Sequence, residues 1–304
     1  MPRNKVPNLF LLGAPKSGTS AIAAQLAQHP EVFLKIKEPR YFDARTYFDF
    51  KEDWPIKSEQ EYLSLFDGYD AANSNYKLDA SVFNMYSPES IRDILSLNPD
   101  AKFILVLRDP LSAAKSMHRQ RLKYIDLKMR ELSEDFGVCW NMLEQRKKGL
   151  CFPVGCRNRF LFRYDLLYSY EKYIPFIKNL ISHEKIFYIN YHDYKKNPIL
   201  VFSKLYKFLN IKRIDIRFDT VNPSNIVKYN TKNVLIHQLR SKLHLFSSLA
   251  GLSGTAVSRR VSAFLRYDFS DAMCSQTDVD LLMTEYFKES RKAMDDVLKI
   301  QNDV

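Results

Sequence analysis

The segment Pro15-Lys16-Ser17-Gly18-Thr19-Ser20 carries the groups that hold a bound anion. An apolar run, Leu9 to Leu12, predicts a strand before it, and Ala21 to Leu26 predicts a helix after it. A loop between a strand and a helix directs backbone N–H groups and the positive end of the helix dipole at one point. The segment therefore predicts a phosphate-binding loop, in which Gly18 allows close backbone approach.

The order of residues in this loop differs from that of the nucleotide triphosphate loop, which requires Gly-Lys-Ser/Thr. Here Gly18 is followed by Thr19, and the lysine, Lys16, stands two places before the glycine. A P-loop kinase or NTPase is an alternative because it shares the strand, loop and helix. The displaced lysine argues against it.

A second anion-binding pattern follows a second apolar run, Phe103 to Leu107, which ends in Arg108-Asp109-Pro110. Asp109 and Pro110 suit the cap and first position of a helix. Arg108 presents a fork of donors that matches phosphate geometry, and Ser116 adds a hydroxyl eight residues later.

Together, these segments resemble the two phosphate-binding motifs of sulfotransferases that use 3′-phosphoadenosine 5′-phosphosulfate (PAPS). The resemblance implies that Arg108 and Ser116 hold the 3′-phosphate, and that Lys16 also stabilises the leaving group during transfer. It implies PAPS as donor, 3′,5′-adenosine bisphosphate (PAP) as product and no metal. The residues implied to hold the 5′-phosphate are Lys16, Ser17, Gly18, Thr19 and Ser20.

Glu38, in Lys37-Glu38-Pro39-Arg40-Tyr41-Phe42-Asp43, resembles the general base of glycan-modifying sulfotransferases, including the heparan sulfate group. His118 and His192 are competing bases, because small-molecule sulfotransferases use a histidine. That histidine precedes the 3′-phosphate strand, whereas no histidine occurs between His29 and His118. We therefore expect Glu38 to be the base.

The segment Lys77 to Phe83 stands where glycan sulfotransferases commonly have a Glu-Lys-Thr-Pro-like sequence. Leu78 replaces the expected lysine, so that either Lys77 substitutes for it or the second cation is missing. Asp79 and Ser81 either stand near the acceptor or simply end a strand. Tyr164 falls where the family often has a tyrosine before a helix, and either an adenine contact or packing explains it.

Strands separated by helices predict an α/β fold with a parallel sheet covered on both faces. The resemblance makes this a P-loop-like three-layer fold with a helical C-terminal part. We expect one domain over residues 1–304, with the resemblance clearest over 8–211 and weaker over 212–304. Further strands are predicted at 32–34, 76–79 and 185–190, and helices at 58–66, 91–97, 111–123, 199–209 and 278–298.

The net charge of +11 predicts either an anionic partner or a solvated basic surface. A nucleic-acid-binding protein would explain the charge, but neither a helix-turn-helix nor a zinc pattern occurs, and it leaves the paired phosphate motifs unexplained. We expect a nucleotide donor and a carbohydrate acceptor, with no nucleic acid as partner. A small-molecule or lipid acceptor and peripheral contact with an acidic membrane stay open.

The apolar segments and the cysteines of the sequence indicate the cellular compartment of the protein. No stretch approaches the ~20 apolar residues of a membrane span, and residues 1–7 lead into the first strand without a signal-peptide core. We therefore expect a cytoplasmic protein. Cys151 and Cys156 could pair in an oxidising compartment, but reduced thiols fit the missing export signal better.

Overall fold

The computed structural model describes residues 6–43, 56–156, 158–218 and 276–302. They belong to two compact units. The first is built from 1–117, 165–223 and 283–304, and the second from 118–164 and 224–282. The expected single domain over residues 1–304 stays a prediction.

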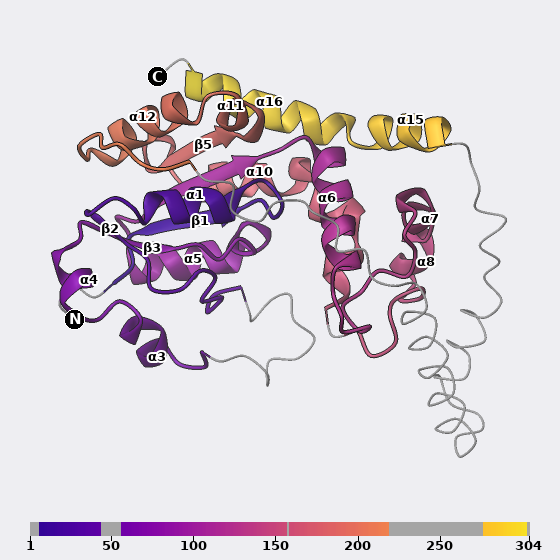
Figure 1. Cartoon of the computed structure of the whole chain (residues 1–304), viewed down its shortest axis with the longest axis horizontal. Coiled ribbons are helices and arrows are strands. Elements are labelled where there is room, and N and C mark those ends of the chain that lie inside the picture. Colours follow the sequence, from indigo (N-terminus) through magenta and orange to yellow (C-terminus); the bar gives the residue numbers. More distant parts are fainter. Residues whose placement is uncertain (1–5, 44–55, 157, 219–275, 303–304) are drawn as a thin grey trace. The chain divides into compact units, whose positions relative to one another are not determined.

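The first unit is built on a five-stranded parallel sheet (Figure 1) with the strand order β2-β3-β1-β4-β5. Because all strands are parallel, their carboxyl ends share one edge, where such sheets bind ligands. The strands are β1 (Leu9–Gly13), β2 (Val32–Phe33), β3 (Tyr76–Asp79), β4 (Lys102–Leu107) and β5 (Ile186–Asn190).

Strand β1 lies at the centre and is buried along its whole length, as expected of a parallel strand covered on both faces. Its residue Phe10 pairs in register with Asp79 of β3 and with Phe103 of β4. The rings of Phe10 and Phe103 stack with 5.8 Å between their centroids.

Helices cover the sheet on two sides and confirm the predicted three-layer α/β fold. Helices α1 (Thr19–Leu26) and α12 (Pro198–Leu209) pack on one face through Ile22, Leu26, Phe202, Leu205 and Leu209. Three helices pack together as the second layer: α10 (Tyr170–Leu180) contacts both α5 (Pro88–Leu97) and α16 (Lys288–Asn302), and α16 also contacts β5. The other described helices of this unit include α3 (Glu59–Ser64), α4 (Tyr69–Asn73), α11 (Tyr191–Lys196) and the 3₁₀ helices Asn84–Tyr86 and His183–Lys185. Helix α9 (Tyr164–Leu167) begins in the second unit and ends in the first.

Local signals predicted several elements correctly. Strand β3 has the predicted bounds, and the Ser87 hydroxyl caps α5 by accepting from Ser90 N–H. The segment after Asn190 begins helix α11 because the Asn190 side chain caps it at His192 N–H.

The C-terminal prediction of one helix over 278–298 is wrong. The structure has two helices, α15 (Gln276–Tyr286) and α16, which break at Phe287. In a continuous helix, Lys288 N–H would donate to the Thr284 carbonyl. That carbonyl instead accepts from Arg291 Nη1 at 2.7 Å.

The second unit contains a fully buried arginine, Arg146, in helix α8 (Leu143–Lys147), which follows α7 (Phe136–Asn141). Its guanidinium donates to Glu131 and, at 2.9 Å, to the Phe162 carbonyl. Burial alone would raise the pKa of Glu131, but the charge and hydrogen bonds of Arg146 outweigh it and lower that pKa. The Tyr164 hydroxyl also donates to Glu131, which favours packing over an adenine contact for this tyrosine.

Helix α6 (Pro110–Leu122) begins in the first unit. Across the described ranges, no helix is both long and apolar enough to span a bilayer. Cys151 is a thiol and does not pair with Cys156.

Candidate active site

The loop between β1 and α1 is shaped by two residues with left-handed backbone, Lys16 (φ 65°) and Gly18 (φ 82°). The Gly18 carbonyl accepts from the N–H groups of Ala21 and Ile22, which starts the helix. The N-cap residue, Gly18, makes no side-chain hydrogen bond to the start of α1. The N-terminal N–H groups of the helix, and its positive dipole end, are therefore directed at the loop, as an anion site requires.

The position of a tyrosine that follows the edge strand β5 explains why residue 18 is a glycine. A Cβ at Gly18 would lie 2.8 Å from Cε2 of Tyr191, the first residue of α11. That separation is too short for any real Cβ, so a larger residue at 18 would require the Tyr191 ring or the loop to shift. Tyr191 thus forms one wall of the loop, a role that its sequence position does not reveal.

Arg108, directly after β4, joins the second phosphate motif to this loop. Its Nη1 donates to the Lys16 carbonyl at 3.0 Å, and its Cζ lies 4.7 Å from the centroid of the Tyr191 ring. The Tyr170 hydroxyl donates to the Arg108 carbonyl at 3.1 Å and lies beside Ser17. Burial raises the pKa of Tyr170, so this hydroxyl keeps its proton and stays a donor.

The helix that follows Arg108 begins as predicted. Asp109 Oδ1 accepts from Ser112 N–H at 2.8 Å and so caps α6, with Pro110 as its first residue. Ser116 is half-buried on the same helix, six residues after Pro110. Thr19 and Ser20 occupy the first two positions of α1.

Glu38 lies on the loop after β2, at the same edge of the sheet. Its carboxylate pairs with Lys37 Nζ, and its side chain is 27% exposed, which leaves it accessible. Glu38 and Arg40 both have left-handed backbone, with φ 61° and 59°. The loop is fastened to β3 because Arg40 N–H donates to Ser81 Oγ at 2.8 Å.

Two buried carboxyl groups lie next to this loop. Asp79, the last residue of β3, accepts from the Tyr62 hydroxyl at 2.6 Å and from Ser81 N–H at 2.8 Å. Asp43 Oδ2 accepts from Arg40 Nε at 3.4 Å. Burial raises the pKa of Asp43 to about 7 even though Arg40 opposes the shift, and the nearby charges of Asp79 and Glu38 add to it. Burial raises the pKa of Asp79 as well.

The comparison with known families identifies this arrangement. The sulfotransferase domain family matches residues 6–241 of the chain. The chain belongs to the sulfotransferase family. This confirms the resemblance drawn from the two phosphate motifs.

Individual sulfotransferases are similar to the chain at low identity. The bifunctional heparan sulfate N-deacetylase/N-sulfotransferase 1 of Caenorhabditis briggsae is 23% identical over 215 residues, covering 69% of this chain and 23% of that protein. Carbohydrate sulfotransferase 15 of Mus musculus is 22% identical over 252 residues, covering 68% and 44%. The chain thus spans less than half the length of these two relatives.

A solved structure supports the fold. The sulfotransferase from Alicyclobacillus acidocaldarius superposes with a TM-score of 0.57 at 23% identity, covering 88% of this chain and 98% of that one. At this identity the likeness concerns the fold alone.

In this sulfotransferase-family chain, the two competing histidines lie on helices α6 and α11 and not on the loops that carry Lys16 and Glu38. His118 belongs to the second unit, where it is buried and its Nε2 lies 2.9 Å from the Ser133 carbonyl. Burial lowers the pKa of His118. His192 is 81% exposed on α11.

The candidates around β3 divide into two groups. Asp79 and Ser81 anchor the Glu38 loop from the end of the strand. Lys77 Nζ instead lies 3.5 Å from the Ser74 carbonyl, before the strand, which does not support its use as a second cation at the carboxyl edge. The sequence did not indicate that the Tyr62 hydroxyl donates to Asp79. For Asp43, the one signal was its place after two aromatic residues in the Glu38 segment.

No cluster of three or more histidine, cysteine, aspartate or glutamate side chains that could hold a metal occurs in the described part of the chain.

Proposed function

We propose that the protein transfers the sulfuryl group of PAPS to a hydroxyl group of a carbohydrate. The hydrogen bond between Arg108 and the Lys16 carbonyl carries this proposal, because it joins a loop suited to a 5′-phosphate to an arginine suited to a 3′-phosphate. Membership of the sulfotransferase family supports sulfuryl transfer. The names of the heparan sulfate and carbohydrate sulfotransferases among the relatives favour a carbohydrate acceptor.

The residues of the β1–α1 loop fit a phosphate group. Its left-handed turn at Gly18 and the uncapped start of α1 offer backbone N–H donors, and the Lys16 ammonium adds positive charge. In the proposal, the hydroxyl groups of Ser17, Thr19 and Ser20 complete this site. Arg108 and Ser116 bind the 3′-phosphate, which ordinary adenylates lack.

Sulfuryl transfer requires the protein to align the acceptor with the donor, to neutralise the charge on the leaving phosphate and to remove the acceptor proton. The acceptor hydroxyl oxygen attacks sulfur, and the bond between sulfur and the 5′-phosphate oxygen breaks. Glu38 takes the proton of the attacking hydroxyl, for which its partly exposed carboxylate is suited. Lys16 stabilises the negative charge that develops on the leaving phosphate oxygen. The products are the sulfated acceptor and PAP.

Nucleotide binding tests whether the protein prefers PAP, as a sulfotransferase should, or ATP, as a P-loop kinase or NTPase should. PAP at 100 times its dissociation constant should stabilise the protein by about 2.7 kcal/mol, a shift readily seen in thermal unfolding. ATP should have no comparable effect. Stabilisation by ATP without a response to PAP would overturn PAPS as the donor and favour the activity of a P-loop kinase or NTPase.

The acceptor class is tested by transfer from ³⁵S-labelled PAPS. Desulfated heparan sulfate, a phenol and a glycolipid are offered in parallel, and the polysaccharide should be labelled. Lys16→Ala should lower transfer by about 10²- to 10³-fold, the range for one deleted transition-state stabiliser. Lys172→Ala, on exposed α10 surface, is the matched control. Labelling of only the phenol or the glycolipid would overturn the carbohydrate assignment and keep the donor.

A further inference from the structure

The C-terminal helix reaches the 3′-phosphate motif through one ion pair. Arg291 Nε on α16 donates to Asp109 Oδ2 at 2.7 Å, across 182 residues of sequence. The other oxygen of the same carboxylate, Oδ1, caps α6 at Ser112 N–H. Asp109, the residue directly after Arg108, therefore contacts two helices, α6 and α16.

We propose that Arg291 is a positioning residue of the donor site, which holds Asp109 so that Arg108 stays available to the 3′-phosphate. The inference rests on the proposed function. Asp109 is the sequence neighbour of Arg108, so the bonds from its carboxylate to Ser112 N–H and to Arg291 fix the chain directly after Arg108. Arg291 supplies the compensating charge from α16, which lies beyond the residues 6–241 that match the family.

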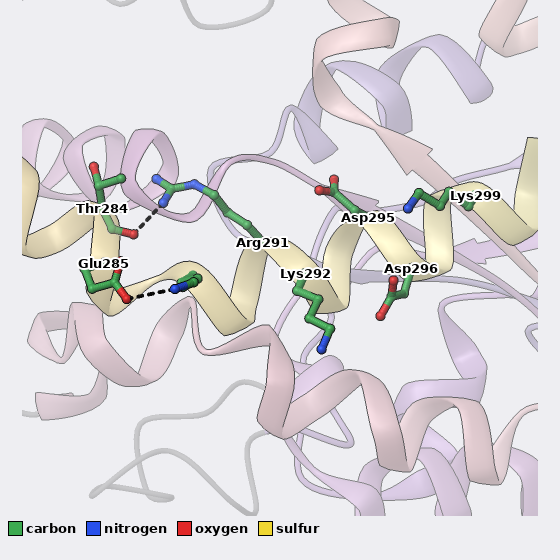
Figure 2. Close-up of a pocket in the computed structure, with 8 residues that line it drawn as sticks. Thr284, Glu285, Arg291, Lys292, Asp295, Asp296 and Lys299 are labelled. Atoms are coloured by element: carbon green, nitrogen blue, oxygen red, sulfur yellow. Dashed lines mark hydrogen bonds and ion pairs between the residues drawn. The ribbon is translucent and has the colours of Figure 1, made fainter.

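The Arg291 guanidinium is held from two sides. Its Nε binds Asp109. Its Nη1 donates to the Thr284 carbonyl at 2.7 Å, near the end of α15, as Figure 2 shows. Burial alone would raise the pKa of Asp109, but the Ser112 N–H and Arg291 outweigh it and lower that pKa. The carboxylate is thus charged in the arrangement that Arg291 stabilises.

Helix α16 is itself fixed to the part of the molecule that carries Arg108. It packs on α10 and β5, and buries Met294 and Val297. Its Ser290 hydroxyl donates to Glu171 of α10. The residue before Glu171 is Tyr170, whose hydroxyl donates to the Arg108 carbonyl. Helix α10 therefore links α16 to Arg108 by a second route.

The charged side chains around Arg291 provide a matched control. Figure 2 shows Lys292 directing its ammonium away from Arg291, and Lys292 is exposed. Lys292→Ala removes the same charge from the same helix but leaves the Asp109 ion pair in place. Arg291→Lys keeps the charge without the fork of donors and should retain part of the effect.

The test is calorimetric binding of PAP and 5′-AMP to the full chain. Arg291→Ala should weaken PAP by about 3- to 10-fold, a range typical of residues that act through a neighbour, and change 5′-AMP by less than twofold. Lys292→Ala should change neither. In Asp109→Asn, adding Arg291→Ala should cause no further loss of PAP binding, because the two act as a pair.

The outcomes separate the two proposals. If wild type binds PAP no better than 5′-AMP, both the proposed function and this inference are overturned. If wild type discriminates and Arg291→Ala keeps the same ratio, only the role of Arg291 is overturned. Equal weakening of PAP and 5′-AMP would make Arg291 merely structural. Should Arg291→Ala not fold, Arg291→Gln gives the same comparison.

Discussion

Arg108 and Lys16, 92 residues apart in sequence, meet through a hydrogen bond of 3.0 Å from the arginine Nη1 to the lysine main-chain carbonyl. The bond exists because β1 and β4 are neighbours in a parallel sheet, so that the residues following them share one edge. Arg108 thereby both shapes the loop and presents its remaining donors beside it.

Removing Arg108 should damage recognition of the 3′-phosphate more than binding of the nucleotide as a whole. We expect Arg108→Ala to weaken PAP by about 1.5 to 3 kcal/mol more than 5′-AMP, the usual loss for a hydrogen bond to a charged group. Calorimetry with both nucleotides measures the difference. Arg92→Ala, an arginine on exposed α5 surface, should leave both affinities unchanged. Equal losses for PAP and 5′-AMP would show that Arg108 does not read the 3′-phosphate.

Gly18→Ala should lower both stability and PAP affinity. The left-handed backbone alone costs a side chain roughly 1–2 kcal/mol, and the Tyr191 ring adds a clash. Gly149→Ala separates the two causes, since Gly149 has a similar φ of +78° but its nearest neighbouring atom lies 4.0 Å away. Thermal unfolding should rank Gly18→Ala below Gly149→Ala, and adding Tyr191→Ala should recover part of the difference. Equal destabilisation at the two glycines would remove Tyr191 from the explanation.

Glu38→Gln should slow the chemical step by about 10²- to 10⁴-fold while PAP affinity survives, because the amide keeps the size of the side chain but accepts no proton. Single-turnover transfer from labelled PAPS measures the step, with PAP binding followed in parallel. Glu59→Gln, on the exposed surface of α3, is the control. A normal rate in Glu38→Gln, together with lost transfer in His192→Asn, would move the base to the histidine.

Asp43 should make stability depend on pH. Its pKa is raised from about 3.8 to about 7, so between these values the folded state binds more protons than the unfolded state. The free energy of unfolding should therefore fall as pH rises from about 4 to 7 and stay low above it. Asp43→Asn should remove this contribution, so that urea midpoints at pH 5 and pH 8 differ less than in wild type. Asp100→Asn, at an exposed carboxyl, should keep the wild-type difference. An unchanged slope in Asp43→Asn would show that this carboxyl is ionised throughout.

Several features could be predicted because they depend on residues close together in sequence. The β1–α1 loop, the bounds of β3 and the Asp109 cap of α6 all follow from short patterns of apolar, glycine and capping residues. The same locality explains the error at the C-terminus. At the break at Phe287, the Thr284 carbonyl accepts from the Arg291 side chain seven residues later, a contact that no local helix signal reveals.

The tertiary structure decided which of these features meet. Tyr191 packs against Gly18, and Arg291 pairs with Asp109, so that both contacts join segments far apart in the chain. The burial that raises the pKa values of Asp43 and Asp79 also depends on tertiary packing. Residue types and spacing indicated phosphate chemistry, because a strand, a glycine loop and a helix start form an anion site by themselves. The partners of that site depend on strand order and helix packing, which place distant residues within hydrogen-bonding distance only after the chain has folded.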